Sequence, residues 1–320
     1  MKAVGLPFLR KSSGGGAGFS FHDSEIRYLE LSGQAGKYRL EAASVISSPG
    51  AVLEQGMLRD VKLLAPLMQR LKDERGAAFP RGITVGLPPR NVMMRVVGVP
   101  EMDLEDARGA LQWDFEKYFP FPVGEAVYDV ADITPDAGGA AGEMKLLVAA
   151  VRSRLVEQIL EIFVPLEIPV SSVEPSLVGA FRSILGPVPG LSGGYLMLLL
   201  EDNSTQLIFG SGGSALLFRT LLVGIGGEGP QEESLESVVR EVRSTLGFVK
   251  GQFRDVPVNS LIIAGPHGDN PEVQERFRQE ISDLSLLSFP LWQTWGMEPP
   301  GGDPRGWESA LGLALRDVIA

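Results

Sequence analysis

Apolar and polar residues along the first part of this chain follow a pattern that predicts three strands, a helix and a further strand. Short polar turns separate the stretches of alternation, and apolar residues then recur every three or four positions, as in an amphipathic helix. Pro66 lies inside the helical stretch and predicts either a kink or a later helix start. The predicted strands are 18–24, 26–32, 37–44 and 82–87, and the helix covers about 59–74.

The second part of the chain repeats this order. Three strands are again followed by a long amphipathic helix and then by a short apolar strand. Such a duplication predicts two α/β units that face each other across a cleft, where ligands commonly bind. The strands are predicted at 195–201, 205–210, 215–223 and 260–264, and the helix at about 232–252.

The residues between the two units predict a small inserted subdomain. Its first helix, 102–118, has Asp103 as the expected N-cap and Asp106 in the capping-box position, while Pro120 and Pro122 end it. The helix is followed by strands 126–133 and 145–150, a helix at 152–164, and, at the end of the chain, a closing helix within 305–320.

Composition narrows the possible functions. The 320 residues carry 29 Lys+Arg against 40 Asp+Glu, and the resulting net charge of -11 disfavours nucleic-acid binding. The absence of cysteine excludes disulfides, thiolate catalysis and iron–sulfur clusters. With only His22 and His267, a histidine-rich metal site is excluded, although an all-carboxylate site is not. The N-terminus lacks the apolar region of a signal peptide, and no apolar run is long enough to span a bilayer.

Four segments, in order along the chain, resemble a known family. They are LQWDFEKYFPFPVGEAVYDV, KLLVAAVRSRLVEQILEIFVPLEIPVSSVEPSLVGAFRS, FRTLLVGIGG and WESALGLALR. With them the chain resembles the PilM family of type IV pilus assembly proteins and, more distantly, FtsA. The resemblance implies an α/β protein with a duplicated actin-like (ribonuclease H-like) ATPase fold and an inserted FtsA/PilM-type subdomain.

The resemblance also implies a division into domains. The first actin-like domain is expected at 1–90, together with 168–190 and the closing helix 305–320. The insertion is expected at 91–167. The second actin-like domain is expected at 191–304, with a helical part at about 228–257.

In this family ATP lies between the two units, held by two hairpins with Asp-x-Gly turns and by a glycine-rich loop. Glycine lets backbone N–H groups approach the phosphates, and the Asp carboxylate holds Mg²⁺ or its waters. Aligned with the family, these positions form a degenerate nucleotide cleft. They are occupied by Ser20, His22, Leu199, Glu201, Gly226, Gly227, Gly265 and His267.

The residues at these positions argue against a nucleotide. Leu199 offers no oxygen to a metal, and Glu201 places a carboxylate where a polyphosphate would lie. Each lost charge-assisted hydrogen bond costs roughly 1.5–3 kcal/mol, so three or four losses weaken binding by about three orders of magnitude or more. We therefore expect no cofactor, no metal and no ATP hydrolysis, while weak nucleotide binding stays open.

Other candidate chemistry in the sequence is weak. The glycines at 14–18 lack the Lys-Ser/Thr pair of a P-loop and are interpreted as a flexible linker. The two histidines are interpreted as unrelated loop residues, and no neighbouring Ser-His-Asp pattern predicts catalysis. Glu201, Asp202 and Asp23 are interpreted as solvated turn acids.

If the cleft does not hydrolyse ATP or bind it tightly, the function is expected to be a protein–protein interaction. The resemblance implies that the insertion and the first domain together hold the cytoplasmic N-terminal tail of PilN, an inner-membrane protein, with other pilus motor components as further partners. The chain would then be cytoplasmic and peripheral at the inner membrane. The candidate partner-binding residues are Arg90, Arg95, Trp113, Tyr118, Phe119 and Phe121.

Helix 102–118 gives these candidates a structural context. Its apolar stripe, which includes Leu111 and Phe115, is expected to face the subdomain core, whereas Trp113 falls off the stripe beside Gly109. Trp113 either lines a groove for a partner or packs against the first domain. Phe119 and Phe121 form either an aromatic wall or part of the core. The two arginines, Arg90 and Arg95, either pair with the tail or are plain surface residues.

The sequence thus predicts a non-catalytic scaffold of type IV pilus or related secretion machinery. Two alternatives stay open: an active actin-like ATPase with rebuilt phosphate loops, and the cytoplasmic part of a GspL-like type II secretion protein. The second alternative would need a transmembrane helix after this domain, and the sequence reaches Ala320 without one. A sugar or acid kinase is disfavoured because those enzymes need the missing Asp positions.

Overall fold

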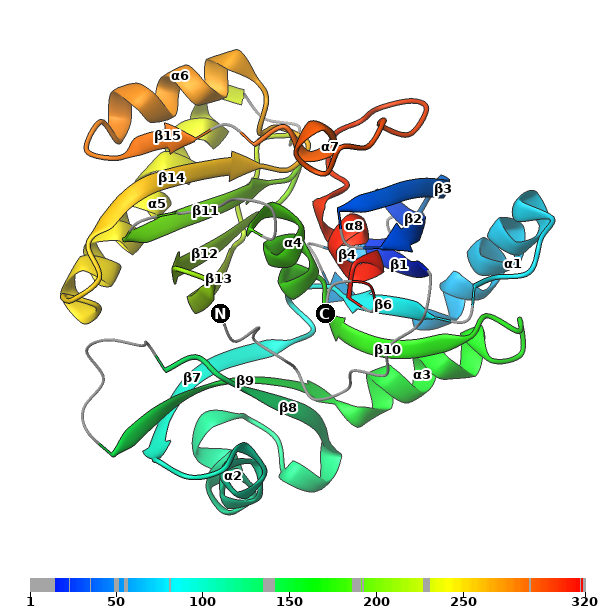
Figure 1. Cartoon of the computed structure of the whole chain (residues 1–320), viewed down its shortest axis with the longest axis horizontal. Helices are drawn as coiled ribbons and strands as arrows, with labels where there is room; N and C mark the ends of the chain where they lie inside the picture. Colours follow the sequence, from blue (N-terminus) through cyan, green and yellow to red (C-terminus); the bar gives the residue numbers. More distant parts are fainter. Residues whose placement is uncertain are drawn as a thin grey trace.

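The computed structural model describes residues 15–22, 24–34, 36–48, 52–54, 57–80, 82–134, 142–185, 191, 193–226, 231–287, 289–316 and 318. The chain forms two lobes and a smaller insertion below them (Figure 1). Each lobe contains a five-stranded sheet, and the insertion contains a three-stranded sheet. Three residues singled out above, Gly14, Asp23 and Gly227, lie outside the described residues.

The sheet of the first lobe has the strand order β10-β6-β1-β2-β3. Strands β1, β2 and β3 form an antiparallel meander, and β6 pairs with β1 in parallel. The bounds are β1 Gly15–Phe21, β2 Glu25–Gln34, β3 Lys37–Ser47, β6 Ile83–Leu87 and β10 Val170–Pro175. A short hairpin of β4 Leu53–Glu54 and β5 Met57–Leu58 precedes the helical turn η1 Val61–Leu63.

The second lobe repeats this arrangement with the order β13-β12-β11-β14-β15. Strands β11, β12 and β13 form the meander, and β14 pairs with β11 in parallel, so the predicted duplication is confirmed. The bounds are β11 Gly194–Leu200, β12 Thr205–Ser211, β13 Ser214–Leu221, β14 Val258–Ala264 and β15 Ser285–Leu287. Helices α5 Gln231–Gln252 and α6 Pro271–Glu280 pack on one face of this sheet.

Two helices lie between the sheets of the lobes (Figure 1). Helix α4, Ser176–Leu185, packs against the second sheet, while α8, Glu308–Ala314, packs against β1 and β2 of the first. The short helix α7, Leu291–Thr294, lies beside them. This layer of helices holds the two halves of the duplication together.

The glycine run near the N-terminus belongs to this packing, so the linker interpretation is wrong for residues 15–18. These residues form most of β1, where they pair with β2. A side chain at Gly16 or Gly18 would come within 2.2 Å or 2.4 Å of a backbone oxygen of α8. Glycine is needed here because the helix backbone lies directly on the strand.

The helix predicted at 59–74 starts later, as Pro66 allowed. Asp60 caps the turn η1 by accepting a hydrogen bond from the Lys62 N–H, and α1 then runs over Leu64–Arg75. Pro66 therefore lies in the first turn, where its missing N–H costs no helical hydrogen bond. Gly76 ends the helix with a φ of 61°.

The insertion differs from its prediction in three ways. The sequence missed β7, Met93–Pro100, which pairs with β9, Glu143–Arg152, while β8, Ala126–Asp132, pairs with the other edge of β9. Helix α2, Leu104–Tyr118, begins after Asp103 as predicted, but the Asp103 side chain forms no capping hydrogen bond. The short turn η2, Val123–Glu125, follows α2.

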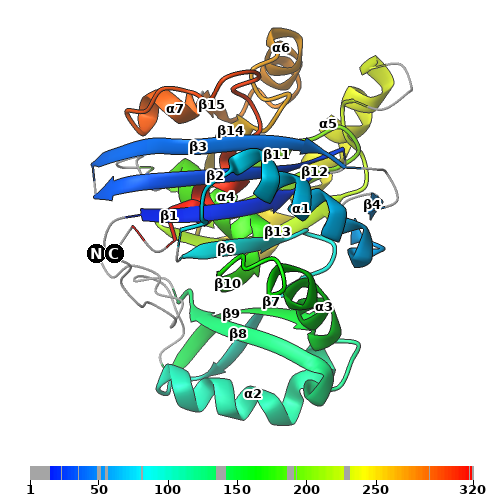
Figure 2. The same cartoon turned by 90° about the vertical axis from the view of Figure 1, so that its right-hand side faces the viewer.

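The third difference concerns α3, Ser153–Phe163, which the sequence assigned to the insertion. Its buried residues Ile159 and Phe163 belong to the same apolar core as Phe19 of β1 and Leu71 of α1. By packing, α3 is therefore part of the first lobe. Figure 2 shows it above the insertion sheet, whereas α2 lies below that sheet. Among the described helices, none is long and apolar enough to cross a membrane.

Candidate functional site

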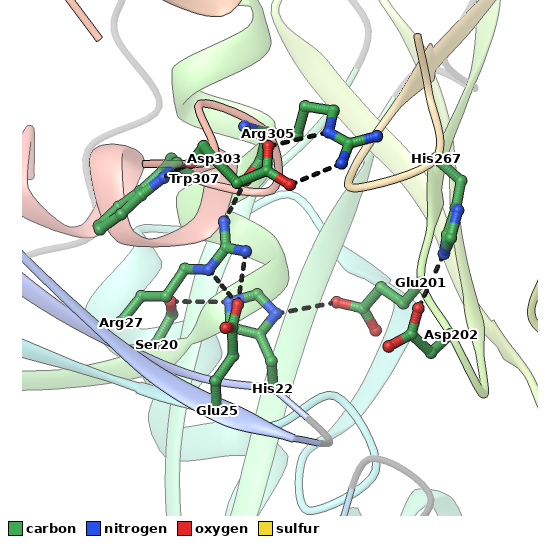
Figure 3. Close-up of polar contacts among 10 residues, drawn as sticks. All are labelled: Ser20, His22, Glu25, Arg27, Glu201, Asp202, His267, Asp303, Arg305 and Trp307. Atoms are coloured by element: carbon green, nitrogen blue, oxygen red, sulfur yellow. Dashed lines mark hydrogen bonds and ion pairs between the residues drawn. The ribbon is translucent and has the colours of Figure 1, made fainter. Parts of the chain in front are cut away.

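Two equivalent turns, one from each lobe, face each other at the predicted nucleotide cleft (Figure 3). His22 directly follows β1, and its N–H donates to the Glu25 carbonyl at 2.8 Å to close the β1–β2 hairpin. Glu201 directly follows β11, and its N–H donates to the Ser204 carbonyl at 3.1 Å. The duplicated fold thus presents both side chains from the same position of each hairpin.

His22 and Glu201 contact each other across the lobes. The His22 Nδ1 lies 3.4 Å from the Glu201 Oε1, and the His22 Nε2 lies 3.0 Å from the Ser20 Oγ. The Ser204 hydroxyl donates to the second Glu201 oxygen at 2.9 Å. Burial alone would raise the pKa of Glu201, but the hydrogen bonds from His22, Ser204 and Gln206 hold it below its ordinary value. Glu201 is therefore ionised at neutral pH.

A second acid–histidine pair lies in the second lobe. The His267 Nε2 lies 2.8 Å from the Asp202 Oδ1, and this hydrogen bond lowers the pKa of Asp202. Gly226 lies against the same turn, because its N–H donates to the Asp202 carbonyl at 3.0 Å. The interpretation of Glu201 and Asp202 as merely solvated acids is thus wrong: each has a specific histidine partner.

Arg27 completes the arrangement, and sequence reasoning did not identify it. It pairs in register with Ser20, is 6% exposed, and donates through Nε to the Glu25 carboxylate at 2.5 Å. Its guanidinium also donates to the Arg305 carbonyl and lies 5.1 Å from the centre of the Trp307 ring. A charged residue within the apolar stretch of β2 was the available signal.

A buried carboxylate, also missed from the sequence, supports the loop after β14. The Gly265 N–H donates to the Glu308 Oε1 at 2.9 Å, and burial raises the pKa of Glu308.

We call Ser20, His22, Arg27, Glu201, Asp202 and His267 the interlobe cluster. Each of the charged members has a partner inside the protein.

The interlobe cluster contains the order of groups found in serine hydrolases. Ser20 contacts His22, which contacts Glu201, although the sequence gave no reason to expect this order. Ser20, however, is 0% exposed, and a nucleophile must reach its substrate.

Within the described chain, no group of three or more His, Asp or Glu side chains is arranged to hold a metal ion. Leu199 is buried in the core beneath the site.

The six candidate partner-binding residues do not come together. Phe119 and Phe121 pack with Phe115 between α2 and the insertion sheet, so their side chains are core residues. Tyr118 is half-buried against the same core. Trp113 is 91% exposed and does not pack on the first domain.

The two arginines lie in different surroundings, one in a connection and one on a strand. Arg90 is half-buried in the connection between β6 and β7, where the insertion joins the first lobe. Arg95 is exposed on β7, in register with Val148, whose side chain packs under α2.

The chain was then compared with known proteins. A sequence profile of the family described as "Type IV pilus assembly protein PilM" matches residues 18–175. The fold matches the structure titled "PilM-PilN type IV pilus biogenesis complex" with a TM-score of 0.80 at 21% identity, covering 97% of this chain and 100% of that one. The resemblance to PilM is confirmed.

Two other solved structures share the PilM-like fold less closely. The cytoplasmic domain of EpsL, an inner membrane component of the type II secretion system of Vibrio cholerae, matches with a TM-score of 0.50 at 12% identity, covering 95% of this chain and 94% of that one. The ethanolamine utilization protein EutJ from Carboxydothermus hydrogenoformans matches with a TM-score of 0.51 at 11% identity, covering 96% and 92%. A search of curated protein sequences gives no match. The duplicated actin-like fold is confirmed. By TM-score, the chain is more similar to the structure from the type IV pilus complex than to the domain from the type II secretion system.

Proposed function

We propose that this PilM-like protein is a non-catalytic scaffold of type IV pilus assembly machinery. It binds the cytoplasmic N-terminal tail of a PilN-like inner-membrane protein and is thereby held at the membrane from the cytoplasm. The fold of a chain solved in a PilM-PilN complex, matched over nearly all of this chain, is the observation that supports this proposal.

The interlobe cluster supports the non-catalytic part of the proposal. An ATP-binding cleft needs bare backbone and free cations facing the phosphates. Here His22 and Glu201 meet in that position, and Arg27 is already bound to Glu25. A triphosphate would have to break these contacts and would lie against the ionised Glu201.

The tail is proposed to bind where the insertion meets the lobes. Side chains of β9 alternate between two faces: Leu146 and Val148 pack under α2, while Ala149 and Val151 pack against the first lobe. The lobe-facing side also carries two partly exposed valines, which leave apolar surface for a short peptide.

These valines are Val96, 38% exposed and in register with Leu147, and Val127, 48% exposed and in register with Val151. Asp129 lies on the same side, in register with Ala149, and burial raises its pKa. An apolar tail with a positively charged amino terminus fits this surface. The sequence analysis did not identify Val127 and Asp129, for which the alternation in β8 was the available signal.

Calorimetry with a synthetic N-terminal peptide of a PilN-like protein tests this proposal. We expect saturable binding that Val127→Glu weakens at least tenfold, because the substitution places a charge on the apolar surface. Val164→Glu, a change at another exposed valine outside this surface, is the matched control. Absence of binding to any PilN-like tail would refute the scaffold proposal.

A further inference from the structure

The outer face of α2 carries an exposed tryptophan that the fold does not use. Trp113 is 91% exposed, and Gly109, one turn earlier, has open space where a side chain would lie. The other three tryptophans of the chain donate their indole N–H groups to backbone oxygens inside the protein. A large apolar ring on the surface without a packing role marks a candidate contact surface.

This face is distinct from the surface proposed for the tail. Helix α2 covers the face of the insertion sheet that points away from the lobes (Figure 2). Trp113, which is exposed and does not belong to the core under α2, lies on the outer side of the helix. Val96 and Val127 lie on the opposite, lobe-facing side of that sheet. One short peptide segment therefore cannot contact both surfaces.

The charges around Trp113 are predominantly acidic. Asp106 and Glu116 are exposed on α2, and the single lysine of the helix, Lys117, is paired with Asp114 at 2.7 Å. Acids in the first turn of a helix are stabilised by its dipole, but Asp114 and Glu116 lie near the C-terminal end, where the dipole disfavours them. The helix dipole thus accounts for an acidic residue at Asp106 but not for one at Glu116.

The acidic charge restricts what can cover this face. A second copy of a chain with net charge -11 and an anionic lipid surface would both be repelled. Cytoplasmic segments next to a membrane span carry an excess of Lys and Arg. The partner in the proposed function, on which this inference rests, is the cytoplasmic part of such a protein.

We propose that the outer face of α2, formed by Asp106, Gly109, Trp113 and Glu116, binds the basic juxtamembrane segment that follows the partner's tail. The indole of Trp113 packs against the aliphatic stems of Lys or Arg and takes part in cation–π contacts, while the carboxylates pair with the charged ends. The tail and the basic segment would thus reach opposite sides of the insertion and strengthen each other's binding.

Two peptides of a PilN-like protein test the inference. One ends before its basic segment and the other includes it. We expect the longer peptide to bind about tenfold more tightly at low salt, and this gain to be lost with Trp113→Ala, with Asp106→Asn/Glu116→Gln, and at high salt. The variant Glu232→Gln/Glu233→Gln, which removes two exposed acids at the start of α5, is the matched control and should keep the gain.

The outcomes separate the two proposals. If neither peptide binds, the proposed function fails. If both bind with equal affinity, or if Trp113→Ala keeps the gain, the α2 inference is overturned while the tail site stands. If sedimentation shows self-association that Trp113→Ala abolishes, the face is an interface between copies and the inference is likewise wrong. A blue shift of the Trp113 emission on binding only the longer peptide would support direct contact.

Discussion

At the scale of single residues, the interlobe cluster decides how the cleft is filled. His22 and Glu201 stand where the sequence analysis expected the glycines of a nucleotide site to be replaced, and their side chains meet across the lobes. The sequence analysis singled out both positions and predicted that the phosphate ligands are lost. It did not predict the contact between them, nor Arg27 and Glu308, because these depend on how distant turns are brought together.

The Glu201 carboxylate is expected to make the fold sensitive to acid. The pKa of Glu201 is lower in the folded chain than its ordinary value. The stabilisation that the ionised carboxylate gives the fold is therefore fully present at a pH above the ordinary pKa, and it is lost as the pH falls through the pKa of the folded chain. Glu201→Gln should lower the free energy of unfolding by about 1–3 kcal/mol near neutral pH and by less in acid. Urea denaturation across pH measures this, and an equal loss at every pH would contradict it.

Glu308 predicts the opposite pH dependence. Its pKa is raised in the folded chain, so ionisation destabilises the fold as the pH rises above the ordinary carboxyl value. Glu308→Gln keeps an acceptor for the Gly265 N–H and should be at least as stable as the parent at neutral pH, with the advantage disappearing in acid. Thermal melts across pH check this, with the exposed Glu298→Gln as control. A strongly destabilised variant at neutral pH would show that the charge itself is required.

At the scale of elements, the helices between the lobes are positioned by close backbone contacts. Helix α8 lies on the glycines of β1, and α4 and α8 meet at Gly179 and Gly312. Periodicity located α1, α2, α3, α5 and four strands in each duplicated unit, but it missed β10 and β15, which complete the two five-stranded sheets. It also missed β7, an edge strand with little alternation in burial. It assigned α3 to the insertion, whereas the buried residues of α3 pack in the core of the first lobe, because periodicity does not say which core a helix covers.

Two glycine substitutions should therefore have opposite effects. A side chain at Gly312 would lie 1.7 Å from the Gly179 carbonyl oxygen, so Gly312→Ala should destabilise the fold by about 1–3 kcal/mol. Gly247 of α5 has open space around it, and Gly247→Ala should stabilise the fold by about 1 kcal/mol through helix propensity. Chemical denaturation of both variants measures the difference, and similar values would contradict the packing of α4 on α8.

At the scale of the whole molecule, two lobes of an actin-like fold are joined by side chains at the predicted nucleotide cleft. The charged groups of the interlobe cluster are paired within the protein (Figure 3), and α4 and α8 lie between the two sheets (Figure 1). The arrangement of the lobes therefore has internal support that does not depend on a ligand.

Mg-ATP is accordingly expected to leave the melting temperature unchanged. A ligand present at a hundred times its dissociation constant would add about 2.7 kcal/mol of stability, a shift that calorimetry readily detects. His22→Gly/Glu201→Gly, which removes the two side chains that meet in the cleft, should melt at a lower temperature without gaining a response to Mg-ATP. Saturable heat of Mg-ATP binding by the unmodified protein would favour the active ATPase instead.

The sequence by itself determined the duplicated order of elements and the apolar stripe of α2, and it predicted the loss of the phosphate ligands, since each depends on residue type and local spacing. The tertiary structure decided which residues meet across the lobes, why β1 begins with glycines, which core α3 covers and that Trp113 lies in solvent. These features depend on contacts between segments far apart in the chain, which local periodicity does not predict.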